Sequence, residues 1–137
     1  GEPFTPLLMN LTRRFNMRLQ FLNKELSVCK VNKITEIGGD FLFSARTDNE
    51  NSLVCETEFV PDGTLEREDG WTAFRIEGQL DFSLTGILAP IAKIMADEGI
   101  GIFAVSTYDT DYVLIKKENG AKAQMALKEN GYIIEKM

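Results

Sequence analysis

The clearest hydrophobic pattern in the sequence begins at Trp71 and continues to its end. Residues 71–78, WTAFRIEG, alternate between two sets of side chains and predict a strand. In residues 85–99, TGILAPIAKIMADEG, apolar side chains recur at helical spacing and predict an amphipathic helix that ends at Gly99. Pro90 suits this helix only within the first turn, where no backbone hydrogen bond is lost. The apolar positions of this helix are Ile87, Leu88, Ile91, Ile94 and Met95.

The remaining C-terminal sequence predicts a hairpin, a second helix and a last strand. Residues 100–107, IGIFAVST, and 112–117, YVLIKK, read as two strands joined by the tight turn YDTD. Residues 118–131 predict a helix and residues 132–137 a final strand. The resulting order, strand–helix–strand–strand–helix–strand, is that of the ferredoxin-like fold, an antiparallel sheet with both helices on one face. We expect the second helix to turn these side chains inward: Ala121, Met125, Ala126 and Leu127.

The first half of the sequence is rich in strand signals. Residues 26–31, LSVCKV, 40–47, DFLFSART, and 51–60, NSLVCETEFV, predict strands, and the turn-like TDNEN separates the last two. No segment between Met17 and Gly70 has the pattern of a ten-residue helix. The sequence therefore predicts an α+β protein in three parts: an N-terminal extension at 1–16, a strand-rich unit at 17–70 and a mixed unit at 71–137.

Composition narrows the class of protein. The 137 residues carry a formal net charge of −6, with 44% hydrophobic and 26% charged side chains, as in an ordinary globular protein. Basic doublets occur at Arg13-Arg14 and Lys116-Lys117. Nucleic acid and anionic membranes require clustered Lys and Arg, so we expect neither as a partner. The apolar runs are much shorter than the ~20 residues that span a bilayer.

The residue types available also limit the possible chemistry. The sequence has no histidine, which excludes Ser-His-Asp and Cys-His catalysis and histidine-ligated metal sites within this chain. Cys29 and Cys55 lie inside apolar runs, and we interpret both as small buried core residues. The sequence shows no phosphate-binding loop, and its acidic residues do not have the spacing of a calcium loop. We therefore expect no catalytic activity, no metal and no cofactor.

Residues 77–117 carry a family resemblance. Their two long motifs, LDFSLTGIL at 80–88 and IFAVSTYDTDYVLI at 102–115, resemble ACT domains, which are small regulatory modules that bind amino acids. More narrowly, this segment resembles stand-alone bacterial tandem ACT proteins and, more distantly, cytosolic arginine sensors and aspartokinase regulatory domains. The match of the N-terminal unit, at LSVCKV and SLVCE, is looser, and residues 1–16 match no known family. The resemblance implies two tandem ferredoxin-like (βαββαβ) units with antiparallel sheets and helices on one face, the N-terminal unit being degenerate. It also implies a cytoplasmic homodimer that binds a free amino acid.

The resemblance implies where that amino acid would bind. Family sites use the loop between the first strand and the first helix, facing the second strand of an adjoining ACT unit. Here Thr85 occupies the position where the common loop has a proline before its glycine. The residues that correspond to the site are Asp81, Phe82, Ser83, Leu84, Thr85, Gly86, Ile87, Val105, Ser106, Thr107 and Asp109.

The loop also has a suitable chemistry of its own. Unpaired N–H groups at the start of the helix after Thr85, together with the helix dipole, form an anion site that suits a carboxylate. Gly86 permits close approach, and Ser83 supplies a hydroxyl. The dipole contributes ~0.3–1 kcal/mol and each charged hydrogen bond about 1.5–3 kcal/mol, whereas micromolar binding requires about 8 kcal/mol. A second group must therefore hold the ammonium, and the candidates are Asp81, Asp109 and Asp111.

Structural roles for the same residues remain open at this point. Ser83 and Thr85 can serve as helix caps, and Asp109 and Asp111 can serve as turn residues. Phe82 and Phe103 suit a core or an interface better than ligand contact. Two functions therefore compete: an amino-acid sensor, and an interaction module without a ligand that associates through the apolar strand IGIFAV.

Overall fold

The computed structural model describes residues 17–77 and 86–137. These residues form one eight-stranded mixed sheet with two α-helices, the α+β class that the sequence predicts. The strand order is β3-β4-β2-β5-β1-β8, and β7 lies between β5 and β6. The strands are β1 (Arg18–Phe21), β2 (Leu26–Val31), β3 (Leu42–Arg46), β4 (Asn51–Glu56), β5 (Glu66–Ile76), β6 (Phe103–Ser106), β7 (Asp111–Lys116) and β8 (Ile133–Lys136).

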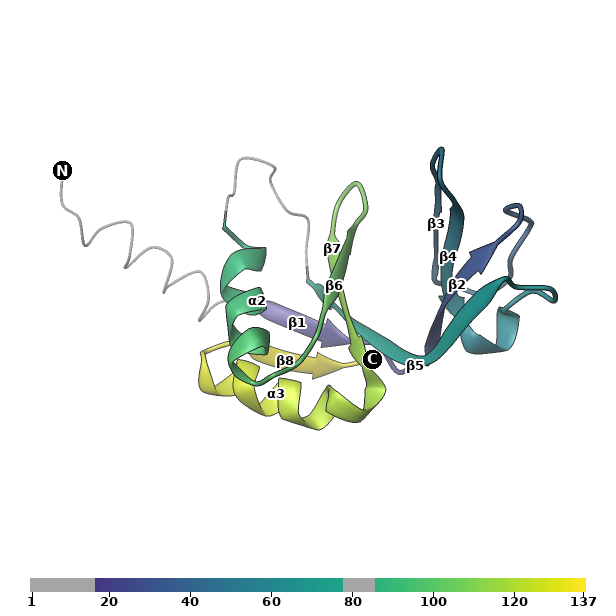
Figure 1. Ribbon diagram of the computed structural model, residues 1–137. Helices are drawn as coiled ribbons and strands as arrows, with labels where there is room; N and C mark the ends of the chain where they lie inside the picture. Colours follow the sequence, from purple (N-terminus) through teal and green to yellow (C-terminus); the bar gives the residue numbers. More distant parts are fainter. Residues whose placement is uncertain (1–16, 78–85) are drawn as a thin grey trace.

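Strand β5 connects the two halves of the molecule (Figure 1). Its first residues pair with β2, and its last residues pair with β7 on one side and β1 on the other. The register with β2 shifts between Leu26 and Val28, next to Gly70 in β5, which has a φ of 85°. The expected boundary at Gly70 thus falls inside a continuous strand.

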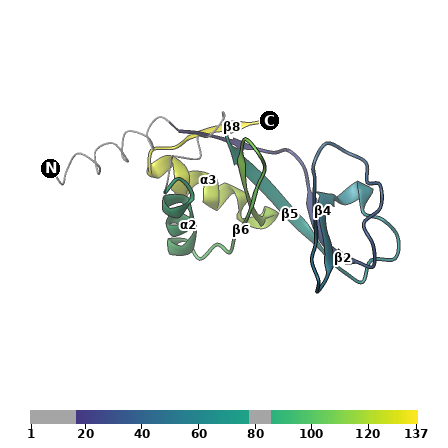
Figure 2. The same cartoon turned by 90° about the horizontal axis from the view of Figure 1, so that it is seen from above.

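The C-terminal half has the predicted order of elements. Helices α2 (Leu88–Asp97) and α3 (Gly120–Glu129) lie on the same side of the sheet (Figure 2). Pro90 is the third residue of α2 and therefore lies in the first turn, as its missing N–H requires. The 3₁₀ turn η2 (Lys117–Asn119) leads from β7 directly into α3.

Strand β1 departs from the expected topology. β5 and β8 are the first and last strands of the ferredoxin-like unit, and in that fold they lie side by side. Here β1 lies between them. β1 runs antiparallel to β5 and parallel to β8, with Arg18 opposite Ile133 and Phe21 opposite Lys136. The prediction of purely antiparallel sheets was therefore wrong for this pair of strands.

The N-terminal half contains β2, β3, β4 and the first part of β5. Its described residues include no α-helix, as predicted, and only the 3₁₀ turn η1 (Thr57–Phe59). Cys29 and Cys55 are 2% and 0% exposed, which confirms that both are core residues. Cys29 packs with Val31 and Leu53, on the face of this sheet that Ile37 and Val60 cover.

The main core lies between the sheet and the two helices. Helix α2 contributes Ile91, Ile94 and Met95, which are buried as the helical spacing predicts. Helix α3 buries Ala126 and Leu127 as predicted, but Ala123 takes the third position. The expectation for Ala121 and Met125 was wrong, since both lie on the exposed face and Met125 is 63% exposed.

A second apolar cluster lies on the other face of the C-terminal sheet. The N-terminal half folds over part of this face, so that Leu26 and Val54 bury Ala73 and Leu114. Aromatic rings border the cluster in two pairs: Phe43 with Tyr112, with centroids 5.2 Å apart, and Trp71 with Phe103, 4.9 Å apart. We call this set the inner cluster: Leu22, Leu26, Val28, Phe41, Phe43, Val54, Trp71, Ala73, Phe103, Val105, Tyr112 and Leu114.

No helix of the described residues is long and apolar enough to cross a membrane.

Candidate ligand-binding site

The structure describes only part of the site expected from the sequence. Gly86 and Ile87, at the end of the loop, are described, as are Val105, Ser106, Thr107 and Asp109 in and after β6. Five of the predicted residues lie outside the described residues: Asp81, Phe82, Ser83, Leu84 and Thr85.

Among the described residues, no side chain caps the start of α2. Gly86 is exposed with a φ of 75°, a conformation that glycine adopts without strain, and no atom of the other described residues lies within 4 Å of the position a Cβ would take. Ile87 occupies the N-cap position and its side chain makes no capping hydrogen bond. The first turn of α2 contains no acidic residue to balance the helix dipole. The side chains of the described residues thus leave the positive end of α2 uncompensated.

The residues at the end of β6 take part in the hairpin to β7. Ser106 donates its hydroxyl hydrogen to Asp111 Oδ1 over 2.5 Å, and Thr107 donates its own to the carbonyl oxygen of Thr110 over 3.0 Å. Thr107 also donates its backbone N–H to that carbonyl. Asp109 lies exposed in the turn. The hairpin therefore gives Ser106, Thr107 and Asp111 a structural role whether or not a ligand binds.

The predicted strand residues lie on two faces of the sheet. Val105 belongs to the inner cluster, on the face opposite α2, whereas Ser106 is directed to the helix face because side chains alternate along a strand. The Val105 side chain and the start of α2 therefore do not share one face within a single unit.

Residues 66–129 match the family model described as an ACT domain. This part of the chain is an ACT domain. The resemblance found in the motifs at 80–88 and 102–115 is thereby confirmed, and the match covers all of β5, both helices and the β6–β7 hairpin.

Solved structures share the fold of most of the chain. A structural-genomics protein from Agobacterium tumefaciens is 28% identical, with a TM-score of 0.79, covering 88% of this chain and 93% of that one. A Vibrio cholerae protein described as a possible transport protein is 17% identical, with a TM-score of 0.71, covering 93% and 99%. The regulatory subunit of aspartate kinase from Thermus thermophilus is 12% identical, with a TM-score of 0.58, covering 82% and 95%. A search of the curated proteins gives no match.

Sequence reasoning missed a polar row on the face of the ACT domain opposite its helices. Arg75 donates from Nε to Gln20 Oε1 over 2.8 Å and from Nη1 to Tyr112 Oη over 3.3 Å. Gln20 in turn donates to Glu135 over 3.4 Å, and Glu135 accepts from Arg18 over 2.7 Å. The available signal was Arg75 itself, an arginine in step with Trp71 and Ala73 on an alternating strand.

Neither thiol has the environment of a nucleophile. Burial raises the pKa of Cys55 to about 11, with the nearby Cys29 adding to the effect, and burial likewise raises the pKa of Cys29. Both thiols are therefore protonated at neutral pH, whereas nucleophilic cysteines have a lowered pKa.

A cavity of about 410 Å³ lies in the N-terminal half, away from the predicted site. Its lining mixes charges of both signs and includes Lys30, Glu50, Glu66 and Glu68. Glu68 already forms an ion pair with Lys116, whose ammonium also lies 4.6 Å from the ring centroid of Trp71. None of the residues predicted for ligand binding lines this cavity.

Proposed function

We propose that this chain is a regulatory protein that binds a free amino acid at an interface between ACT units. The observation that carries the proposal is the start of α2. An exposed Gly86 precedes this helix, no described side chain caps it, and its first turn contains no acidic residue. Such a helix end favours a carboxylate. The fold shared with the regulatory subunit of an aspartate kinase supports a regulatory role.

The ligand requires a second wall, which we assign to a second copy of the chain. The loop and the helix end contribute about a few kcal/mol of binding free energy, less than the roughly 8 kcal/mol that micromolar binding requires. Within the described residues, β6 pairs only with β7 and leaves one edge of the sheet open. A homodimer that approaches along this edge would enclose the ligand and exclude water, which strengthens each polar contact.

Calorimetric titration of the dimer with each of the twenty amino acids tests this function. We expect at least one amino acid to bind and the Gly86→Asp variant to weaken its binding at least tenfold, because the new carboxylate repels that of the ligand. Gly63→Asp is the matched control, since Gly63 has the same φ of 75° and nothing within 4 Å of its Cβ position. Absence of binding at millimolar concentration, or equal binding by the Gly86→Asp variant, would contradict the proposal.

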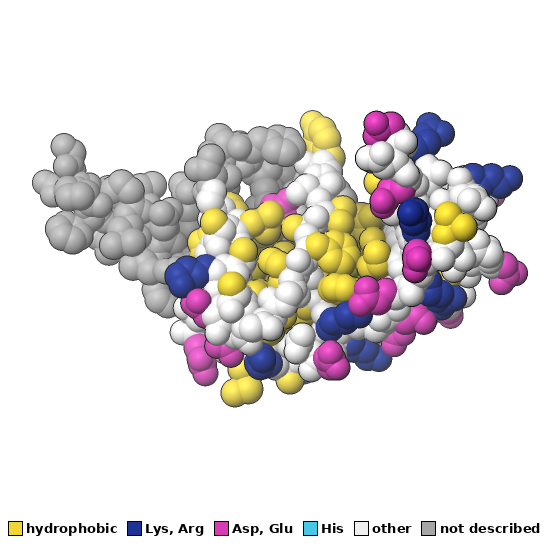
Figure 3. Space-filling view, in the orientation of Figure 1, with side chains coloured by type: hydrophobic (Ala, Val, Ile, Leu, Met, Phe, Trp, Pro, Cys, Tyr) yellow, Lys and Arg dark blue, Asp and Glu magenta, His cyan; other side chains and the backbone are white. Residues whose placement is uncertain are grey.

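A second candidate is an interaction module that needs no ligand. The open edge of β6 favours it, since apolar side chains lie on the surface to both sides of the β6–β7 hairpin (Figure 3). In this case the dimerisation constant, measured by analytical ultracentrifugation, would be the same with and without amino acids and in the Gly86→Asp variant. A change in that constant with an amino acid would favour the sensor.

A further inference from the structure

The guanidinium of Arg75 is half-buried and has no counter-ion among the described residues. Its two hydrogen bonds to described residues go to neutral groups, the amide oxygen of Gln20 and the hydroxyl of Tyr112. A guanidinium has five N–H donors, so three remain without a partner in the described parts of the chain. Its Nη atoms, which form the fork that binds carboxylates in a bidentate manner, hold all three.

Two other arginines of the sheet pair with carboxylates. Arg18 meets Glu135 at 2.7 Å, and Arg67 meets Asp69 at 3.0 Å. Glu135 is the carboxylate that reaches toward Arg75 through Gln20, but Arg18 already neutralises it and lowers its pKa. No described carboxylate pairs with the half-buried Arg75, so its remaining donors can bind an acceptor from outside.

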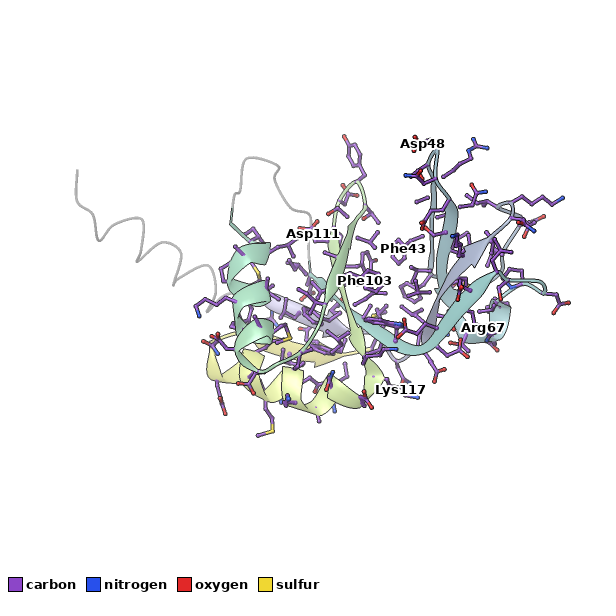
Figure 4. The ribbon with its side chains drawn as sticks, viewed as in Figure 1. Phe43, Asp48, Arg67, Phe103, Asp111 and Lys117 are labelled. Carbon is purple, nitrogen blue, oxygen red and sulfur yellow. The ribbon has the colours of Figure 1, made fainter. Side chains whose placement is uncertain are left out.

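The surroundings of Arg75 are aromatic. Tyr112 is its cross-strand neighbour, and the Tyr112 ring is tilted by 58° against Phe43 of β3. Val105 lies opposite Tyr112 on β6. These three side chains are only partly buried and form the border of the inner cluster. Figure 4 shows Phe43 directed into the space between the β3–β4 and β6–β7 hairpins, and hydrophobic side chains occupy the surface there in Figure 3.

We propose that this border is a second binding site, for a small organic acid with an aromatic body. The carboxylate pairs with the free fork of Arg75, and the ring packs against Phe43 and Tyr112. Charge complementarity selects the acid, and the exposed aromatic faces select a flat apolar body. The site lies on the face of the sheet opposite α2 and does not depend on amino-acid binding at Gly86.

The probes for this site are 3-phenylpropionate and 3-phenylpropionamide, which share a body and differ in charge. We expect the acid to bind at least tenfold more tightly than the amide, because the charged hydrogen bonds are lost in the amide. Titrations followed by amide shifts in ¹H–¹⁵N NMR spectra locate the binding, which should move the signals of Arg75, Val105 and Tyr112. Equal binding of the two probes, or no binding of the acid at 10 mM (roughly the weakest affinity of interest), would overturn the proposal.

Three variants separate the role of Arg75 from effects on folding. Arg75→Gln should abolish the preference for the acid over the amide, whereas Arg75→Lys should retain part of it. Arg46→Gln, at the exposed end of β3, is the control and should behave as the wild type. The Gly86→Asp variant should bind 3-phenylpropionate as the wild type does. The proposal for this site and the proposal for the amino-acid site can therefore be refuted independently. Binding of an acidic peptide but not of 3-phenylpropionate would indicate a protein partner and would overturn the proposal of a small ligand.

Discussion

Glu56 is a buried charge whose partners come from a distant loop. The residue is 3% exposed. Its Oε2 accepts N–H groups from Asp40 at 2.6 Å and Phe41 at 3.3 Å, and its Oε1 lies 3.1 Å from Lys24 Nζ. Burial by itself opposes ionisation, but these contacts outweigh it, and the pKa of Glu56 lies below its ordinary value of 4.5. A Cβ on Gly39, which has a φ of 90°, would overlap the carboxylate.

Replacing Glu56 by Gln should therefore destabilise the protein in a pH-dependent way. Because the folded-state pKa is lowered, the contribution is fully present above the unfolded pKa and is lost as the pH falls through the folded value. We expect a loss of about 1–3 kcal/mol at pH 7 that narrows below pH 4, measured by urea denaturation. The control is Glu58→Gln, which alters an exposed residue of η1. A loss that is independent of pH would show that the carboxylate's charge is not responsible.

The burial of a single residue could be predicted where its neighbours in sequence determine its environment. Cys29 and Cys55 lie in apolar runs and are buried. Glu56 is also buried, but its partners belong to a loop fifteen and sixteen residues away. Arg75 was missed because its environment depends on Gln20 and Tyr112, which only the sheet brings together. The start of the candidate site was readable because Gly86 and α2 are adjacent in sequence.

Helix α2 shows how a local signal determines where a helix ends. After the helix, Gly99 has a φ of 71°, and its N–H donates to Ala96 O over 3.0 Å. The N–H of Ile100 donates to Met95 O over 2.9 Å, and Ile100 is itself buried in the main core. This double hydrogen bond with a left-handed glycine is the Schellman motif. The glycine ending predicted from sequence is thus confirmed with its geometry.

Gly99→Ala tests the contribution of this helix end. An alanine in the left-handed region costs about 1–2 kcal/mol, so we expect that loss in the free energy of unfolding. Gly101→Ala is the matched control, two residues later, with no positive φ and nothing within 4 Å of its Cβ position. Its unfolding free energy should equal or exceed that of the wild type. An equal loss in both variants would mean that the left-handed conformation of Gly99 is not the cause.

The periodicity of helix α3 does not determine which of its faces is buried. Ala121 and Met125 are four residues apart, and so are Ala123 and Leu127, so both pairs satisfy the helical spacing. The second pair is buried, because packing against the sheet, not the spacing, decides which face turns inward. An alanine-rich helix with few large apolar residues leaves this choice open in the sequence.

At the scale of the molecule, the pairing of β1 could not be read from the sequence. Arg18 lies opposite Ile133 and Glu77 donates its N–H to Arg18 O, contacts between residues far apart along the chain. Short strands carry no signal of their partner beyond alternation. The hydrophobic pattern predicts a boundary between two units at Gly70, yet β1 joins the sheet of the second half and β5 extends into the first.

The shared strand predicts that the two halves unfold together. Trp71 lies in β5 between the halves and is the chain's one tryptophan, so its fluorescence reports on their junction. Urea denaturation followed by Trp71 fluorescence and by far-ultraviolet circular dichroism should give coincident transitions. Two separated transitions in the dichroism would show instead that the halves fold as independent units.

The parallel pairing of β1 and β8 determines how the sheet resists a pulling force. A force that pulls the start of β1 away from the end of β8 acts along both strands in opposite directions. The flanking hydrogen bonds, Ile133 N–H to Met17 O and Met137 N–H to Phe21 O, lie at the two ends of this pair. The force then loads all the hydrogen bonds between the two strands at once, instead of opening them one after another. The pair of strands therefore resists separation most strongly along this direction.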